Sequence, residues 1–454
     1  MSVAMRIWMA WLVVVAACDH IGKSDDTPNP TYSVVLTIKS EQNPDLDLLF
    51  LIDDSPSMAD KQAAFVNVLP QFLDQLASID GGRPNIHFGV ASSDMGTKGS
   101  GSPLPANPIG GGPGSCMGTG KGGALQVVGT ALSSGNFLVD SRDGTTNYTG
   151  ALVDVMTAML QLGETGCGFE QTLAGMRAAL DNNPMNTGFL RASANLAVIV
   201  LSDEDDCSVI DPGFFGTAPE LGPLQSFRCF PQGTRCTPDN PMEAGVKTGC
   251  GVRLPPTYLE DPATFKTFLL GLKDNDPRRV MFGAVVGDPT HVEVTIAPPP
   301  GGGPAVPTLV HSCTYDIGAG TAVADPPVRL VSLAGTFPGV SRIESVCNGD
   351  LSPALGSLGK AVKTLVGDTC LAQPLPDGDP ATAGVQASCQ LVDVRDSAPQ
   401  SPTVLPACGA AETDCFELVE DATGCPDAQH LKLVVHRSAP APDDAWSTLR
   451  CAVQ

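Results

Sequence analysis

The stretch DLLFLIDDSPSM, residues 47–58, decides the fold of this chain. Its first half is a short, continuous apolar run between two aspartates, which is typical of a strand buried on both faces of a parallel sheet. Its second half changes at once to small polar residues, so a loop follows the strand directly. Ligands of such sheets bind at the carboxyl ends of the strands. The sequence therefore places a candidate site in this loop.

Strand-like and helix-like segments alternate along the rest of the chain. Further buried runs are IHFGVAS at 86–92, LAVIVLS at 196–202 and VMFGAVV at 280–286. Strands that alternate with helices predict an α/β fold, with a doubly wound, mostly parallel sheet and helices on both faces. Pro70 lies inside the first helical pattern and predicts a kink or break there. Apolar residues at helical spacing mark helices around 65–76, 169–180, 265–272 and 355–365, the last ending near Gly367.

Three oxygen-bearing side chains follow the first strand at alternate positions, namely Asp53, Ser55 and Ser57. In an extended loop this spacing lets the side chains converge on one point. One carboxylate and two hydroxyls are hard oxygen donors, which suit Mg²⁺, Mn²⁺ or Ca²⁺ better than Zn²⁺. The same residue types also suit a helix N-cap that needs no metal. Of these two interpretations we favour the metal site.

The D-x-S-x-S pattern after a buried strand and before a helix resembles the metal-ion-dependent adhesion site of von Willebrand factor A domains. LAVIVLS is followed directly by Asp203, where that family places a further metal-associated aspartate. The resemblance covers roughly residues 43–372 and implies the Rossmann-like fold of the family. It also implies that a bound Mg²⁺ or Ca²⁺ is completed by a carboxylate from a protein ligand, so that the site binds rather than catalyses.

The third family element, a threonine in a Gly-rich loop before a later helix, is not matched. The register of the helix AGMRAAL puts Glu170 at that position, and the resemblance then implies that Glu170 joins Asp53, Ser55, Ser57 and Asp203. Thr165 and Thr172 remain alternatives after a small register shift. An additional carboxylate favours Ca²⁺ over Mg²⁺ weakly. The acidic run 203–206 could extend the metal shell, but beyond Asp203 we favour its interpretation as a solvated loop.

The first residues carry targeting features. Arg6 precedes the apolar run 7–17, which is too short for a permanent membrane span. The run ends in VAAC, which resembles a lipobox, so residues 1–18 are expected to form a lipoprotein signal peptide with Cys18 as the lipidated residue. The alternative is an ordinary cleaved signal peptide with a chance cysteine. The polar, proline-containing residues 19–42 predict a flexible linker.

The cysteines indicate an exported, disulfide-bonded protein. Of 15 cysteines, 14 remain without Cys18, an even number that permits seven disulfides. Residues 207–258 and 288–324 have little regular pattern and are interpreted as loop insertions stapled by disulfides. Residues 373–454 predict a small Cys-rich, β-leaning domain, because a core of this size needs covalent support. The alternative is an extension wrapped over the first domain.

Composition and motifs exclude several classes of function. The net charge of −23 opposes binding to nucleic acid, and membrane contact is expected through the lipid anchor alone. No G-x-S-x-G, H-E-x-x-H or P-loop motif occurs, so we expect no enzyme, and His87 within a buried strand is expected to be structural. We expect a lipid-anchored protein of the cell envelope, on the inner or outer membrane and facing the periplasm or the exterior. Its von Willebrand factor A domain would bind a protein ligand through a divalent cation. The alternative is a structural or assembly scaffold of the envelope with a vestigial metal site.

Overall fold

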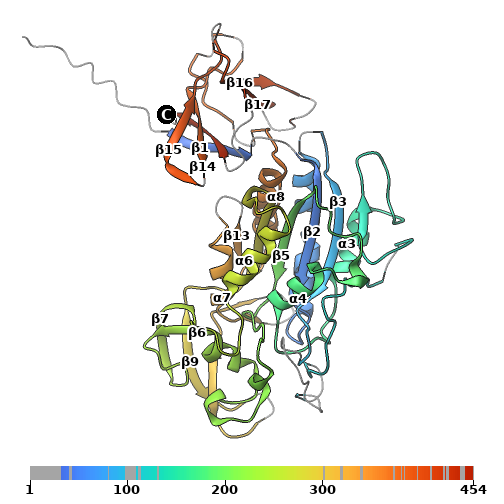
Figure 1. Cartoon of the computed structure of the whole chain (residues 1–454), viewed down its shortest axis with the longest axis vertical. Coiled ribbons are helices and arrows are strands. Elements are labelled where there is room, and N and C mark those ends of the chain that lie inside the picture. Colours follow the sequence, from blue (N-terminus) through green and yellow to red (C-terminus); the bar gives the residue numbers. More distant parts are fainter. Residues whose placement is uncertain are drawn as a thin grey trace, which may run out of the picture.

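A computed structural model gives the structure of the chain (Figure 1). The predicted signal peptide and Cys18 lie outside the residues it describes. No helix in the described part of the chain has the length and apolar character needed to cross a bilayer. The described residues are 32–452, except 40–42, 80, 98–108, 111–113, 130–131, 300–301, 317–320, 338–340, 372–373, 380, 383, 396, 410–411, 423–424, 426–428 and 440–444.

A six-stranded sheet forms the centre of the main domain, with the strand order β13-β8-β5-β2-β3-β4. All neighbouring strands are parallel except β4, which runs antiparallel to β3. The predicted mostly parallel sheet is therefore confirmed, whereas the short edge strands β4 and β13 were not predicted. The strands are β2 (Asp45–Ile52), β3 (Asn85–Ser92), β4 (Leu138–Asp140), β5 (Asn195–Leu201), β8 (Val280–Val286) and β13 (Arg342–Ser345).

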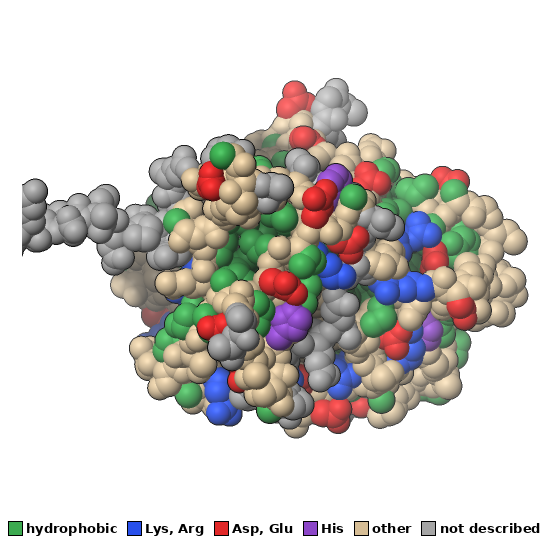
Figure 2. Space-filling model, turned by 90° about the horizontal axis from the view of Figure 1, so that it is seen from above, with side chains coloured by type: hydrophobic (Ala, Val, Ile, Leu, Met, Phe, Trp, Pro, Cys, Tyr) green, Lys and Arg blue, Asp and Glu red, His purple; other side chains and the backbone are tan. Residues whose placement is uncertain are grey.

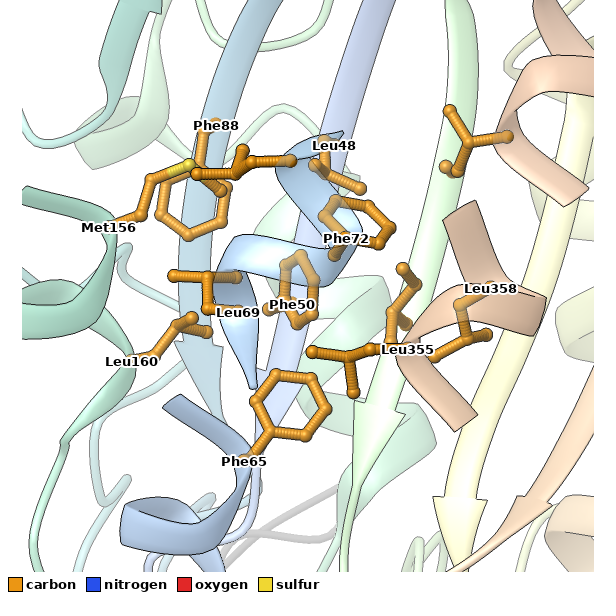
Figure 3. Packing of buried hydrophobic residues seen from close by; sticks show 14 of the residues in the cluster. Leu48, Phe50, Phe65, Leu69, Phe72, Phe88, Met156, Leu160, Leu355 and Leu358 are labelled. Carbon is orange, nitrogen blue, oxygen red and sulfur yellow. The ribbon is translucent and has the colours of Figure 1, made fainter. Parts of the chain in front are cut away.

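Helices cover both faces of this sheet, as predicted (Figure 1). Successive side chains of a strand point to opposite faces, so Phe50 of β2 joins one core and Leu49 and Leu51 join the other. Figure 3 shows Phe50 among rings from both neighbouring helices and β3. One face carries α1 (Ala59–Asn67), α2 (Leu69–Ala77), α3 (Leu152–Leu160) and α8 (Ser352–Val366), and the other carries α4 (Thr172–Leu180), α6 (Pro262–Gly271) and α7 (Val328–Ala334).

Two helix boundaries follow from single residues. The helical pattern around 65–76 is broken at Val68, so that Pro70 lies in the first turn of α2, where its missing N–H has no partner to lose. Gly367 ends α8 in the left-handed region at φ 81°, a conformation that costs glycine little. Both predicted boundaries are confirmed.

The connections make the carboxyl ends of β2 and β5 the point at which the strand order reverses. From β2 the chain crosses one face through α1 and α2 to reach β3, and it enters β5 through α4 on the other face. The two connections lie on opposite faces of the sheet, and β3 and β5 lie on opposite sides of β2. The strand order therefore reverses between β2 and β5. In open α/β sheets such a reversal is where ligands bind.

The two insertions form a single structure, the insertion lobe, whose four strands have the order β10-β9-β7-β6. Strand β7 of the first insertion pairs with strand β9 of the second. Cys207–Cys229 and Cys236–Cys250 staple the first insertion as predicted, and Cys313–Cys347 ties the end of the second to the segment after β13. The lobe contains η2 (Pro212–Phe215), η3 (Pro219–Leu221), η4 (Ser226–Arg228), α5 (Cys229–Gly233), β6 (Thr234–Thr237), β7 (Gly245–Val252), β9 (Val292–Ala297) and β10 (Val306–Val310), and the hairpin β11 (Cys313–Asp316) and β12 (Thr321–Ala324) follows. Elsewhere, η1 (Pro184–Asn186) and η5 (Pro277–Arg279) precede β5 and β8.

The Cys-rich β region at the C-terminus is confirmed, and it has its own apolar core and three disulfides. It lies at the opposite end of the molecule from the insertion lobe (Figure 1). Its sheet has the order β1-β18-β14-β15, beside the hairpin β16-β17. With the four other bridges, all 14 cysteines after Cys18 are paired, which confirms seven disulfides. The strands are β1 (Tyr32–Lys39), β14 (Cys389–Arg395), β15 (Ala398–Leu405), β16 (Cys415–Glu420), β17 (Leu431–His436) and β18 (Ala445–Ala452).

The predicted flexible linker over 19–42 is wrong for its second half. Residues 32–39 form β1, which pairs antiparallel with β18 at the other end of the chain. Leu36 and Ile38 pack into the C-terminal core, so the burial of apolar side chains and the backbone pairing both hold this segment in place. The C-terminal domain is therefore built from two segments that the main domain separates in sequence. Residues 19–31 and 40–42 lie outside the described residues.

Charges on the described surface are mixed. On the face drawn in Figure 2, acidic and basic side chains are interspersed, and the described residues form no continuous basic stripe there.

Candidate metal centre

The loop after β2 places the three motif side chains at the carboxyl ends of β2 and β5. The backbone N–H of Asp53 donates to the carbonyl of Leu201, which joins the loop to the end of β5. The N–H of Ser55 donates to Asp53 Oδ1 at 2.9 Å, a local turn that aspartate favours. Asp53 and Ser55 are 1% and 2% exposed, whereas Ser57 is exposed. The candidate site is therefore buried at its base and open at Ser57.

The structure brings the predicted serines and Asp203 together. Ser55 Oγ and Ser57 Oγ lie 3.2 Å apart, and Ser57 Oγ donates to Asp203 Oδ1 at 3.1 Å. Asp53 Oδ2 accepts a hydrogen bond of 2.7 Å from the hydroxyl of Ser202, the residue before Asp203. The loops after β2 and β5 thus present adjacent oxygen atoms.

Lys61 adds a positive charge that sequence reasoning missed. Its side chain is 3% exposed, and its ammonium lies 2.9 Å from Asp203 Oδ2. The same ammonium donates to the carbonyl of Ser57 at 2.8 Å. Lys61 is one turn into α1, so its helix position points it back toward the motif loop. The ion pair compensates part of the negative charge of the cluster.

Glu170 lies in the same buried cluster, at the turn that precedes α4. It is 1% exposed, and its Oε1 has no hydrogen-bond partner. Its pKa is raised well above the usual value by burial first, and then by the charges of Glu204 and Asp53. Of the two threonine alternatives, Thr165 is exposed, while Thr172 is buried with an unpartnered hydroxyl.

The electrostatics of the cluster fit a cation. Burial, followed by the nearby charge of Asp203, raises the pKa of Asp53 to about 6. Burial raises the pKa of Asp203 against the lowering effect of Lys61. Buried carboxylates without full compensation are costly, and a divalent ion would remove that cost. The orphaned Glu170 oxygen and the hard-oxygen donors therefore fit Mg²⁺ or Ca²⁺.

The donor set must combine carboxylates with hydroxyls. Within the described ranges, no three His, Cys, Asp or Glu side chains are grouped so that they alone could hold a metal ion. A cation here would be held by Asp53, Ser55, Ser57 and Asp203, with Glu170 beside them. Hydroxyl and carboxylate oxygens suit the hard divalent ions rather than zinc.

Asp205 and Asp206 at the end of the acidic run 203–206 are held by protein partners, which corrects the interpretation of the run as a solvated loop. Asp206 is fully buried and pairs with Arg329 at 2.9 Å, while its Oδ1 accepts the N–H of Leu173 at the start of α4. Asp205 accepts the first N–H groups of α7, including that of Leu330 at 3.1 Å. Carboxylates at helix N-termini satisfy unpaired N–H groups and complement the helix dipole.

Two further residues position the motif loop. Asp54 is fully buried, pairs with Lys121 and accepts a 2.7 Å hydrogen bond from Ser92 at the end of β3. Gln62 donates to the carbonyl of Asp53 at 2.9 Å and exchanges hydrogen bonds with the backbone of Gly163. Of these two, only Asp54 could be suspected from the sequence, because it is an acidic residue next to a buried strand. His87 contacts the carbonyl of Phe189 through Nδ1 at 2.8 Å and packs against Phe137.

The raised pKa of Asp53 predicts a pH-dependent stability in the cation-free protein. Because the folded-state pKa is about 6 and the usual value is 3.8, the folded state binds the proton more tightly. Stability is therefore greatest below the usual pKa and falls as the pH rises through about 6, by about 2–3 kcal/mol for this group. We expect urea unfolding in EDTA to show a loss of this size relative to Asp53→Asn between about pH 4 and pH 7. A difference between the two proteins that is constant with pH would contradict the prediction.

Comparisons with known proteins identify similar solved structures but do not assign the chain to a family. No protein-family model matches the chain, and no curated protein matches it. Among solved structures it is similar to a von Willebrand factor type A protein from Catenulispora acidiphila, with 9% identity and a TM-score of 0.27 over 90% of this chain and 58% of that one. It is also similar to a pilus adhesin from Streptococcus pneumoniae, with 10% identity and a TM-score of 0.23 over 93% of this chain and 57% of that one. A human COPII-coat protein has 8% identity and a TM-score of 0.27 over 91% of this chain and 40% of that one. The chain spans less than two thirds of each, and scores this low carry no argument, so the fold rests on strand order and register.

Proposed function

We propose that this chain is a lipid-anchored envelope protein whose von Willebrand factor A-type domain binds a protein ligand through a divalent cation. The observation that carries the proposal is the convergence of the motif loop on Asp203, where Ser57 Oγ lies 3.2 Å from Ser55 Oγ and donates to Asp203 Oδ1 at 3.1 Å. The cluster lies where the strand order reverses, the position at which this class of sheet binds ligands. The envelope location rests on the sequence features of residues 1–18.

The residues of the cluster divide into base and rim. Asp53 and Ser55 are buried and are oriented by Ser202 and by the turn of the loop itself, so they are held before any ion arrives. Ser57 is exposed and lies on the open side. The cation would supply a positive charge that accepts a carboxylate of the ligand. An oriented base with one open side suits binding of a carboxylate from another protein.

A second function is favoured by a specific observation, the ion pair between Lys61 and Asp203. An ammonium within the cluster compensates charge without any metal. The domain would then be a structural or assembly scaffold of the envelope with a vestigial site. The two proposals differ in whether the full chain binds a divalent ion.

The first experiment is a calorimetric titration of the EDTA-stripped full chain with Mg²⁺ and with Ca²⁺. We expect saturable binding in the native chain and its loss in Asp53→Ala, because the substitution removes the carboxylate at the base of the site. Asp154→Ala, which removes an exposed carboxylate on α3, is the matched control and should bind as the native chain does. Absence of binding in the native chain would refute the metal-dependent proposal.

The second experiment separates ligand capture from scaffolding. The full chain is incubated with solubilised envelope proteins in Mg²⁺ or in EDTA, and cross-linked partners are quantified. The metal-dependent proposal predicts that EDTA and the double substitution Asp53→Ala, Ser55→Ala remove the same partners. Capture that is unchanged by both treatments would favour the scaffold.

A further inference from the structure

The hairpin β11-β12 is attached to the loop that carries Asp203. The N–H of Asp325, the residue that follows β12, donates to the carbonyl of Asp203 at 2.7 Å. At the same end of the hairpin, the Cys313–Cys347 disulfide ties β11 to the segment after β13. A backbone hydrogen bond and a covalent bond therefore hold the hairpin beside the candidate metal centre.

The face of the hairpin that packs on the main domain carries Tyr315. In the antiparallel pairing, Tyr315 lies opposite Ala322. Two residues along, Cys313 lies opposite Ala324, and alternate pairs of a hairpin share one face. Ala322 and Ala324 are buried, and Ala324 belongs to a core of the main domain against which Cys313 also packs. The half-buried side chain of Tyr315 is thus directed toward the main domain, whereas the neighbouring Thr314 is exposed.

The hydroxyl of Tyr315 is close enough to the acidic residues of the centre to be affected by their charges. Its pKa is raised by burial first, and then by the charges of Asp60 and Asp203. The hydroxyl therefore keeps its proton and can act as a donor. Both carboxylate oxygens of Asp203 already have partners, Oδ1 with Ser57 at 3.1 Å and Oδ2 with Lys61 at 2.9 Å. Among the described residues the Tyr315 hydroxyl has no hydrogen-bond partner, so it is available to a ligand.

We propose that Tyr315 is a further ligand-binding residue of the candidate metal centre, and that its hydroxyl donates a hydrogen bond to the carboxylate of the protein ligand. The inference deepens the proposed function, on which it rests. A carboxylate that binds the cation through one oxygen leaves the second oxygen to be satisfied. A charged oxygen that loses water without gaining a donor is costly. Tyr315 supplies that donor beside Asp203, to which the exposed Ser57 is bonded.

Terbium luminescence tests whether Tyr315 lies beside the ion. Tb³⁺ takes the hard oxygen ligands that Ca²⁺ takes, and it emits when an excited tyrosine ring lies close to it. Tb³⁺ is titrated into the full chain while tyrosine is excited, and Ca²⁺ is then added to displace it. We expect an emission that Ca²⁺ removes and that is largely lost in Tyr315→Phe. Tyr148→Phe is the matched control, because Tyr148 bonds to Asp140 opposite the first residues of β3, at the other end of the sheet.

Acetate is the probe for the carboxylate of the ligand. It is titrated into the Tb³⁺-loaded chain, and the emission lifetime under direct excitation of the ion reports the replacement of a bound water by acetate. We expect Tyr315→Phe to weaken acetate binding by about tenfold, the effect of one hydrogen bond to a charged group, and to leave the calorimetric affinity for Mg²⁺ unchanged. Tyr148→Phe should bind acetate as the native chain does.

Failure of the metal centre and failure of the role of Tyr315 give different results. If the native chain binds no Mg²⁺, the metal-dependent function is refuted and this inference with it. If the ion binds while Tyr315→Phe keeps the tyrosine-excited emission, or binds acetate as tightly as the native chain, the inference alone is overturned. Equal losses of Mg²⁺ and acetate affinity would show a purely structural role and would also overturn it. Tyr315→Phe keeps the ring, and thermal unfolding checks that it is folded.

Discussion

Replacement of Asp47 by alanine is expected to lower the free energy of unfolding by about 3–5 kcal/mol, the cost of leaving buried charges without their partner. Asp47 lies on β2 and is fully buried. Its Oδ1 accepts Arg191 Nε at 2.8 Å, and its Oδ2 lies 3.2 Å from the ammonium of Lys273, which is itself fully buried. The substitution would leave the Lys273 ammonium facing only a backbone carbonyl.

Urea unfolding of the native chain and of Asp47→Ala measures this effect. Glu417→Ala is the matched control, because it removes a half-exposed carboxylate that pairs with exposed His436 at 2.8 Å. Exposed pairs of this kind contribute about 0–1 kcal/mol. A loss for Asp47→Ala no larger than that of the control would show that the buried ion pair does not stabilise the sheet as described.

Replacement of Lys61 by methionine is expected to have two large and opposite effects. In EDTA the Asp203 carboxylate loses the ammonium at 2.9 Å and remains buried, so the free energy of unfolding should fall by about 3–5 kcal/mol. In the presence of a divalent cation, removal of a repelling positive charge should tighten cation binding by roughly tenfold or more. Methionine retains most of the apolar volume of lysine, so packing of α1 changes little.

The matched measurements are urea unfolding with EDTA or with saturating Mg²⁺, and calorimetric titration of the ion. Lys266→Met, which removes a half-buried lysine on α6, is the control and should change neither quantity. If Lys61→Met binds Mg²⁺ no more tightly than the native chain, the ammonium does not compete with the ion. That result would separate the role of Lys61 in stability from any role in the candidate site.

The central sheet was predictable because burial on both faces leaves a local signature. A strand such as β5 is apolar at nearly every position, so the run LAVIVLS predicts a buried strand without knowledge of its neighbours. The break before Pro70 and the end of α8 at Gly367 were predictable for a similar reason, since each depends on the backbone chemistry of one residue. The position of the motif loop was also predictable, because the loop joins directly to a predicted strand.

Other elements have sequence patterns that are too weak to predict them. The strand β1 is short and lies beside a polar segment, so its sequence resembles a linker until β18 is placed against it. The edge strands β4 and β13 have three and four residues, too short for a reliable pattern. Pairing of distant segments depends on contacts that no local window contains.

By itself, the sequence determined the α/β sheet, the helices on both faces, the even set of disulfide cysteines and the position of Asp53, Ser55 and Ser57 after β2. These follow from local periodicity and from residues adjacent in the chain. The tertiary structure decided that two insertions form one lobe, that Lys61 pairs with Asp203 and that Glu204 and Phe227, from different segments, line one pocket. Charges and rings from separate segments act together only after long-range packing has brought them within a few ångströms, because electrostatic and aromatic contacts depend on distance and orientation rather than on order in the chain.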